Sequence, residues 1–417
     1  MEGIFYRKYG ALSILSVFCS IVAISCATSS SVGGYSTRDN AEHFNTQSDF
    51  PAKKNHATQL GAESQNATGP IAASASVAGS GSLDSGTELW LFGPVASPEL
   101  CTPLGAKGVR SIIDLRHLPE GQAGRALKIY ADRGLGLALC LRWRNPASER
   151  SNVKITGNYD VPPTQEEADR AISKLTEIFG SEDAKRIGDR LFVQFYNEVG
   201  GGPGTFPPDN ADELLAFATR AATEIRKVNS QLRICGPAVT GGQLQPRQST
   251  GSSKMKGKAE VIEKAISWSA EHADVIDLHL HGVDGSWSRP ALEKLRGSLD
   301  QTSRGKTVRI VSFEWSCARY PDRENDEGIR NAIRGIWKTL NDFNLICAAY
   351  GPYWPLKNKA SAKMADRFGW ESIVDAEGRR NPPVYETLQE IGGGNGIDEP
   401  KSKRSKRGKR SKKRGNH

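Results

Sequence analysis

Two apolar runs in this chain end on a glutamate, and the two glutamates could carry acid–base and nucleophilic chemistry. The run LFVQFYNE (191–198) ends in Asn197 and Glu198, and a Gly-rich loop follows at once. The run TVRIVSFEWS (307–316) carries Glu314 near its end. An apolar strand that stops on a carboxylate before a loop is how a barrel enzyme presents an acid at its catalytic rim. Two carboxylates on one rim suit glycoside hydrolysis, in which one donates a proton and the other attacks the anomeric carbon.

The elements that would position these glutamates are apolar strands alternating with helical segments over residues 88–391. Runs this apolar are typical of parallel strands covered on both faces. Eight such βα units predict an α/β chain with a closed (β/α)8 TIM barrel. A doubly wound open sheet is the alternative, but no GxGxxG follows the first strand and no GxxxxGK[ST] occurs, which removes the main support for its nucleotide-binding forms. The predicted strands cover 89–95, 109–116, 135–143, 191–198, 232–240, 275–282, 308–316 and 345–355.

Polar and aromatic residues gather where these strands end, more densely than strand ends require. Catalytic residues of such barrels come from the carboxyl ends of the strands. Aromatic rings there can stack on the apolar faces of sugars, and arginine and asparagine can bind hydroxyl groups. The candidates, in chain order, are Asp114, Arg116, His117, Arg142, Trp143, Arg144, Asn197, Glu198, Asp277, His279, His281, Glu314, Trp315, Tyr353 and Trp354.

With Asn-Glu ending the fourth strand and Glu ending the seventh, the pattern resembles the clan A glycoside hydrolases, retaining (β/α)8 enzymes that include cellulases, mannanases and β-xylosidases. The resemblance implies that Glu198 is the general acid/base, that Glu314 is the nucleophile, and that Asn197 binds the hydroxyl next to the anomeric carbon. It implies further substrate contacts from Arg116, which resembles an arginine that supports the nucleophile, and from Trp354, which resembles a tryptophan that floors the sugar site.

Four further residues complete the expected substrate site: His279, His281 and two aromatic residues, Trp143 and Tyr353, the second of which precedes Trp354. Several families of the clan carry His-x-Tyr where this chain reads His-Leu-His at 279–281. The expected site uses no cofactor and no metal.

Two other functions remain open. His279 and His281 lie on one face of a strand and could chelate a divalent ion in a metal-dependent hydrolase, with His117 as a further ligand. A non-catalytic glycan-binding barrel at the cell surface could use the same carboxylates for hydroxyl contacts.

The ends of the chain differ from its centre in composition. Residues 1–27 combine Arg7 and Lys8 with a short apolar stretch, which predicts a signal peptide, and AISC at 23–26 resembles a lipoprotein signal with a lipid anchor at Cys26. The alternative is ordinary cleavage after Ala27. Residues 28–86 are rich in Ser, Ala, Gly and Asn, which predicts a disordered tether from the cell envelope to a barrel over 87–395. We therefore expect an exported protein, either lipid-anchored or secreted.

The formal net charge of +9 lies in a disordered basic tail over 396–417, because 401–414 holds ten lysines and arginines and no acid. An exported tail of this kind favours an anionic polymer or lipid surface over nucleic acid. The seven cysteines form no CxxC motif, which argues against a zinc ribbon.

Overall fold

The computed structural model describes residues 86–92, 98–117, 122–144, 160–199, 210–244, 253–322, 324–351, 369–374 and 379–394. The predicted signal peptide, the tether, the basic tail, Tyr353 and Trp354 lie outside these ranges. Export and lipid attachment at Cys26 therefore stay predictions. Among the described helices, none is both long enough and apolar enough to cross a membrane.

Parallel strands close into a barrel, as the sequence predicts. Strands β1 to β5 pair in chain order, β5 pairs with β7, β7 with β8, β8 with β9, and β9 pairs back with β1. The two-residue β6 continues the fifth strand and pairs with β7. The strands are β1 (Glu88–Phe92), β2 (Gly108–Asp114), β3 (Gly136–Arg142), β4 (Leu191–Phe195), β5 (Arg233–Cys235), β6 (Val239–Thr240), β7 (Val275–His281), β8 (Arg309–Ser316) and β9 (Cys347–Tyr350).

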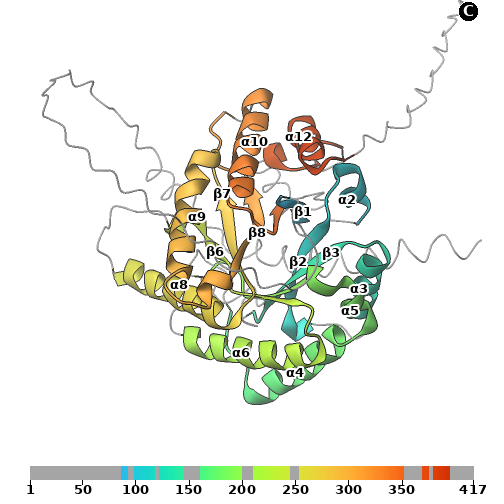
Figure 1. Cartoon of the computed structure of the whole chain (residues 1–417), viewed down its shortest axis with the longest axis vertical. Helices are drawn as coiled ribbons and strands as arrows, with labels where there is room; N and C mark the ends of the chain where they lie inside the picture. Colours follow the sequence, from blue (N-terminus) through green and yellow to red (C-terminus); the bar gives the residue numbers. More distant parts are fainter. Residues whose placement is uncertain are drawn as a thin grey trace, which may run out of the picture. The chain divides into compact units, whose positions relative to one another are not determined.

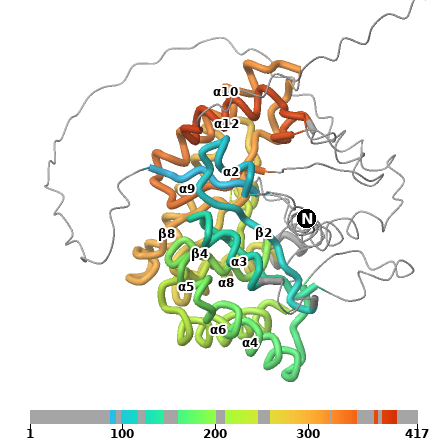
Figure 2. Tube along the Cα trace, turned by 90° about the vertical axis from the view of Figure 1, so that its right-hand side faces the viewer, coloured from blue at the N-terminus to red at the C-terminus, as the bar shows by residue number. Residues whose placement is uncertain are grey.

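Helices surround the strands (Figure 1). They alternate with the strands, as the sequence predicts, and α2, α5 and α7 are short additional helices in the described part of the chain. In Figure 2, the last helix, α12, lies beside α2 near the start of the barrel, which brings the two ends of the barrel domain together. The helices are α2 (Pro98–Leu104), α3 (Gln122–Asp132), α4 (Gln165–Phe179), α5 (Glu182–Ile187), α6 (Ala211–Val228), α7 (Gly241–Leu244), α8 (Ser253–His272), α9 (Gly285–Leu299), α10 (Asp326–Asp342) and α12 (Pro382–Gly392).

The inside of the barrel is closed below the mouth by packed aromatic rings. Trp90 contacts Phe192 and Phe313, with ring centroids 5.4 and 6.0 Å apart. The indole lies against Gly108 and Gly136, where an added Cβ would come within 2.5 and 2.3 Å of indole carbons. Only glycine allows this approach, so two glycines on neighbouring strands make room for one tryptophan. This aromatic layer supports the polar layer above it.

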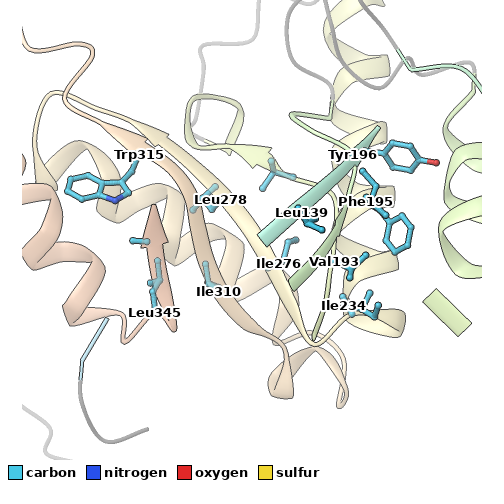
Figure 3. Packing of buried hydrophobic residues seen from close by; sticks show 14 of the residues in the cluster. Leu139, Val193, Phe195, Tyr196, Ile234, Ile276, Leu278, Ile310, Trp315 and Leu345 are labelled. Atoms are coloured by element: carbon cyan, nitrogen blue, oxygen red, sulfur yellow. The ribbon is translucent and has the colours of Figure 1, made fainter. Parts of the chain in front are cut away.

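The larger apolar core lies between the strands and the helices. Figure 3 shows part of it: the labelled side chains of Tyr196 and Trp315 point away from the strands. Trp315 packs on Trp337 of α10, with centroids 5.8 Å apart. The Tyr196 hydroxyl donates to the carbonyl of Leu214 in α6 at 2.9 Å. Residues on this outer face hold helices onto the barrel, so they are not available to a substrate at its mouth.

Candidate active site

Two predicted residues, Glu198 and Glu314, come together with two histidines at the carboxyl ends of the strands. One nitrogen or carboxylate oxygen from each of Glu198, His279, His281 and Glu314 lies within 4.8 Å of the others. The two carboxylates are only partly buried, with side chains 29% and 19% exposed. Both carboxylates are therefore accessible to a solute, although they lie above buried side chains of the barrel.

A break in β4 aims Asn197 and Glu198 into the barrel. Phe192 and Gln194 face inward, so simple alternation would turn Tyr196 inward as well and Asn197 outward. Tyr196 and Glu198 instead adopt positive φ angles of 64° and 43°, which non-glycine residues rarely do. Left-handed residues of this kind cost about 1–3 kcal/mol each and gather at functional sites. The result is that Tyr196 faces the helices and both Asn197 and Glu198 face the mouth.

A bulge in β8 turns Glu314 inward. Val311 and Phe313 belong to the cluster inside the barrel, so strict alternation would place Glu314 on the outer face. Asp277 pairs with Val311, and Leu280 pairs with Trp315. Between these two pairs, β8 contains one residue more than β7. The pairing of β8 with β9 contains the same extra residue. An extra residue turns every later side chain of the strand to the opposite face of the sheet. The side chain of Glu314 therefore lies inside the barrel, and that of Trp315 faces the helices.

Arg110 of β2 is the cation that contacts Glu314. Its side chain is fully buried, and Nη1 donates to Glu314 Oε2 at 3.1 Å. Nη2 donates to Gln194 Oε1 at 3.2 Å and also to Asn197 Oδ1. The guanidinium carbon lies 4.5 Å from the centre of the Phe92 ring. Arg110 thus ties β2, β4 and β8 together beneath the two glutamates.

Arg116 does not have the position that the resemblance implies. Its guanidinium bonds the carboxylate of Asp114 at 2.9 Å, two residues back on the same segment. The arginine that supports Glu314 is Arg110, six residues earlier, and this corrects the prediction. The signal in the sequence was a charged residue inside an apolar strand, because a buried charge needs a partner.

Trp143 is not a sugar-stacking residue, which corrects a second prediction. It is only 4% exposed and faces outward from the end of β3. Its ring packs edge-on against Phe217 of α6, with centroids 5.8 Å apart. Its neighbours Arg142 and Asp160 form a buried ion pair at 3.1 Å. Trp143 therefore belongs to the packing between strand and helix.

The two histidines of β7 contact the carboxylates of Glu198 and Glu314. His279 Nδ1 lies 3.2 Å from Glu198 Oε1 and 3.6 Å from Glu314 Oε2, while His279 Nε2 lies 2.9 Å from Asp277 Oδ2. His281 Nε2 lies 3.3 Å from Glu314 Oε1, and its Nδ1 lies 3.0 Å from Ser316 Oγ. Both predicted histidines are thus in the site. His281, the second histidine of the His-Leu-His segment, thus contacts Glu314 directly.

The charges of the site shift one another's pKa values. Burial opposes the charged form of Glu314, but His279, His281 and Arg110 outweigh burial and lower the pKa of Glu314 to about 2. Burial also opposes protonation of His279, yet Asp277, Glu314 and Glu198 raise its pKa to about 10. The pKa of His281 is raised as well, against burial, by Glu314 and Glu198. At neutral pH the site therefore holds an ionised Glu314 beside a protonated His279.

The same four side chains have the types and spacing of metal ligands, but their charges argue against a metal. Arg110 is a permanent cation 3.1 Å from Glu314 Oε2. Both ring nitrogens of His279 lie within hydrogen-bonding distance of carboxylates, as in an imidazolium. These positive groups compensate part of the charge of the carboxylates, which weakens the attraction of the site for a divalent ion. His117, the third candidate ligand, does not belong to this cluster.

Comparison with known proteins gives a likeness in structure alone. No protein-family model matches the chain, and no curated protein matches it in sequence. A glucosidase from Croceicoccus marinus superposes with a TM-score of 0.51 and 11% identity, covering 71% of this chain and 61% of that one. An exo-β-1,4-mannosidase from an Opitutaceae bacterium gives 0.47 and 14%, covering 74% and 59%. A β-xylosidase from Caulobacter crescentus gives 0.48 and 12%, covering 75% and 72%.

The chain thus spans less than two thirds of the length of the first two of these enzymes. At identities this low, the likeness to the glucosidase concerns the fold and not the chemistry. The chain has the (β/α)8 barrel fold that this glycoside hydrolase also has.

Proposed function

We propose that this protein is a retaining glycoside hydrolase, with Glu198 as general acid/base and Glu314 as nucleophile. The observation that carries the proposal is the placement of two partly exposed carboxylates within 4.8 Å of each other at the mouth of a (β/α)8 barrel. Retaining enzymes hold their two carboxyl groups about 5–5.5 Å apart, whereas inverting enzymes leave room for a water between them. A glycosidase fold in a structural neighbour supports the same reading.

The surroundings of Glu314 suit a nucleophile. A nucleophilic carboxylate must be ionised when the substrate arrives, and the pKa of about 2 keeps Glu314 ionised at neutral pH. Arg110, His279 and His281 hold the carboxylate from three sides and so fix its direction of attack. This arrangement favours Glu314 over Glu198 for the nucleophilic role.

The surroundings of Glu198 suit an acid/base. Its side chain is the more exposed of the two, and His279 is the group it contacts in the described part of the chain. An acid/base must reach both the leaving-group oxygen and an incoming water, which the exposed position allows. Asn197 gives its carbonyl oxygen to Arg110, so its NH2 group is the part that can donate to a sugar hydroxyl.

The proposed reaction has two displacements. Glu198 donates its proton to the glycosidic oxygen while a Glu314 oxygen attacks the anomeric carbon, so the bond to the leaving group breaks and a glycosyl ester forms. A water then attacks the same carbon and gives its proton to Glu198, and the ester bond to Glu314 breaks. The sugar leaves with the configuration it had in the substrate.

The test is hydrolysis of a panel of aryl β-glycosides by the full chain, followed by chemical rescue. We expect Glu314→Ala and Glu198→Ala to lose activity, and azide to restore it through different products. Azide in the Glu314 variant should give the α-glycosyl azide, while azide in the Glu198 variant should give the β-glycosyl azide. Glu386→Gln, which changes an exposed glutamate on α12, is the matched control and should keep activity.

Each alternative predicts a different outcome of this test. A folded protein that binds glycans but releases no aglycone from any substrate would support the glycan-binding barrel instead. Activity that is lost on treatment with a chelator and returns with a divalent ion would support the metal-dependent hydrolase. We expect the chelator to have no effect, because Arg110 and His279 already compensate part of the charge of the carboxylates.

A further inference from the structure

We propose that Asp277 is a positioning residue for this reaction: its buried carboxylate fixes the ring of His279 so that His279 Nδ1 faces both Glu198 and Glu314. The inference rests on the proposed function, and it assigns a role to a residue that itself touches neither glutamate in the structure. Asp277 and His279 are 0% and 1% exposed, so both side chains lie in the barrel with no room for solvent.

Three donors hold the Asp277 carboxylate in place. The backbone N–H of Phe313 in β8 donates to Oδ1 at 2.7 Å, and Gln194 Nε2 of β4 donates to Oδ2 at 2.6 Å. His279 Nε2 lies 2.9 Å from the same Oδ2. Two of these donors come from other strands, β8 and β4, so the carboxylate cannot rotate without breaking a bond to another strand.

This anchoring fixes one proton of His279 on Nε2, so a second proton on the ring can only lie on Nδ1, the nitrogen that faces the glutamates. Oδ2 of an ionised aspartate can only accept, so His279 Nε2 must be the donor in that contact. The ring then presents Nδ1 to Glu198 at 3.2 Å and to Glu314 at 3.6 Å. A donor at Nδ1 would place one positive hydrogen beside both Glu198 and Glu314 and would lower the repulsion between the two carboxylates whenever both are ionised.

The surrounding charges favour this doubly protonated ring. Arg110 approaches from β2, Glu198 from the end of β4, Asp277 and His281 from β7, and Glu314 from β8. The site thus contains three carboxylates, one arginine and two imidazoles. Without a proton on His279, the negative charge of the site would exceed the positive charge whenever Glu198 is ionised, as it is after it has given up its proton, and an unbalanced charge in a buried setting is costly.

Replacing Asp277 by asparagine would reverse the hydrogen bonding at this anchor. The N–H of Phe313 requires an oxygen at the Oδ1 position, so the new NH2 group would take the Oδ2 position. There it would face two donors, Gln194 Nε2 and His279 Nε2. His279 could respond only by losing its Nε2 proton or by turning its ring. Loss of the Nε2 proton leaves the hydrogen on Nδ1 but removes the positive charge of the ring, and turning the ring moves Nδ1 away from the glutamates.

The first test measures the wild-type full chain and needs no substrate. Side-chain ¹⁵N spectra of the seven histidines, with the His279 signal assigned by its loss in His279→Gln, report both nitrogens across pH. We expect His279 to keep both protons from pH 6 to 9, with a midpoint about 10. A midpoint near the ordinary 6.5 would overturn the inference, even if the protein hydrolyses glycosides.

The second test is kinetic. We expect Asp277→Asn to lower kcat about tenfold or more, as loss of an outer partner of a histidine ligand does at metal sites, with a smaller change in KM. The acid limb of kcat/KM should move to higher pH, because Glu314 loses the cation that keeps it ionised. In a His279→Gln background the same substitution should have little further effect, since residues acting through one another are not additive.

The matched control is Ser312→Ala. Ser312 is a fully buried residue of β8 whose hydroxyl donates to the carbonyl of Leu278 at 2.7 Å. Its loss should lower the midpoint of urea unfolding slightly and leave the pH profile unchanged. An Asp277→Asn enzyme with the wild-type pH profile and kcat would overturn the inference and leave the hydrolase standing. If that variant does not fold, the wild-type titration decides. A wild-type protein with no hydrolysis, but with His279 protonated to about pH 10, would overturn the hydrolase and the catalytic role of Asp277 together.

Discussion

Arg110 and Glu314, 204 positions apart in the chain, meet with Nη1 and Oε2 at 3.1 Å. The arginine is fully buried on β2, and the glutamate lies near the end of β8. Because the same guanidinium also bonds Gln194 and Asn197, it links the two halves of the site.

Removing the charge of Arg110 should disturb both stability and the titration of Glu314. In Arg110→Met, three side-chain oxygens lose a buried donor, and breaking a buried pair on one side costs about 3–5 kcal/mol. The pKa of Glu314 should also rise, so the acid limb of kcat/KM should move to higher pH. Urea unfolding and pH–rate profiles measure the two effects.

Arg116→Met is the control for this prediction. Arg116 pairs with Asp114 on its own segment, so its removal should leave the acid limb where it was. An equal shift of the acid limb in both variants would mean that the Arg110–Glu314 contact does not set the pKa of Glu314.

The stability of the protein should fall as pH rises above neutrality. The folded-state pKa of His279, about 10, is above its ordinary value of 6.5, so its stabilising contribution is complete below about 6.5 and is lost as pH rises through about 10. The loss is on the order of a few kcal/mol. Unfolding in urea at pH 6.5 and pH 10.5 measures it. The fall should be smaller in His279→Gln, and equal falls in both proteins would contradict the assignment.

The opposite sign applies to Glu314 at low pH. Its folded-state pKa of about 2 is below its ordinary value of 4.5, so its contribution is present above about 4.5 and is lost as pH falls toward 2. Glu314→Gln should therefore reduce the loss of stability between pH 5 and pH 2. Urea unfolding across this range, with Glu386→Gln as the control on an exposed glutamate, measures the difference.

Trp143→Phe should change stability without changing substrate affinity. The indole packs between β3 and Phe217 of α6, so a smaller ring leaves a cavity that costs about 1–3 kcal/mol. Because the ring faces away from the mouth, KM for any substrate should stay within about twofold of wild type. A tenfold rise in KM with unchanged stability would show that Trp143 contacts sugar after all.

Gly108→Ala should be among the most damaging single-methyl changes in the barrel. The added Cβ would lie 2.5 Å from the indole of Trp90, which the rings of Phe192 and Phe313 hold in place. Overpacking of this kind costs about 1–3 kcal/mol or more. Gly124→Ala in α3 is the matched control, because nothing lies within 4 Å of its added Cβ. It should raise the free energy of unfolding by about 0.5–1 kcal/mol.

The fold was predictable because its signal is local. Each strand of a parallel barrel is covered on both faces, so it reads as a continuous apolar run, and the runs alternate with helical segments. The same logic located Glu198 and Glu314, because strand ends are visible where an apolar run meets a polar loop. His279 and His281 were found in the same way, since regular alternation along β7 puts both on one face.

The facing of the glutamates depended on tertiary structure. Alternation from Phe313 would turn Glu314 outward, and alternation from Gln194 would turn Tyr196 inward. The bulge in β8 turns Glu314 inward, and the left-handed residues after β4 turn Tyr196 outward. Neither feature can be recognised from the pattern of apolar and polar residues. Arg110 was missed, and Trp143 was misassigned, for the related reason that the face of a residue depends on its partners across the sheet. The sequence by itself determined the barrel and the strand ends that carry the chemistry. Only the three-dimensional pairing of strands decided which of those side chains meet, because one extra residue in a strand turns every later side chain to the other face.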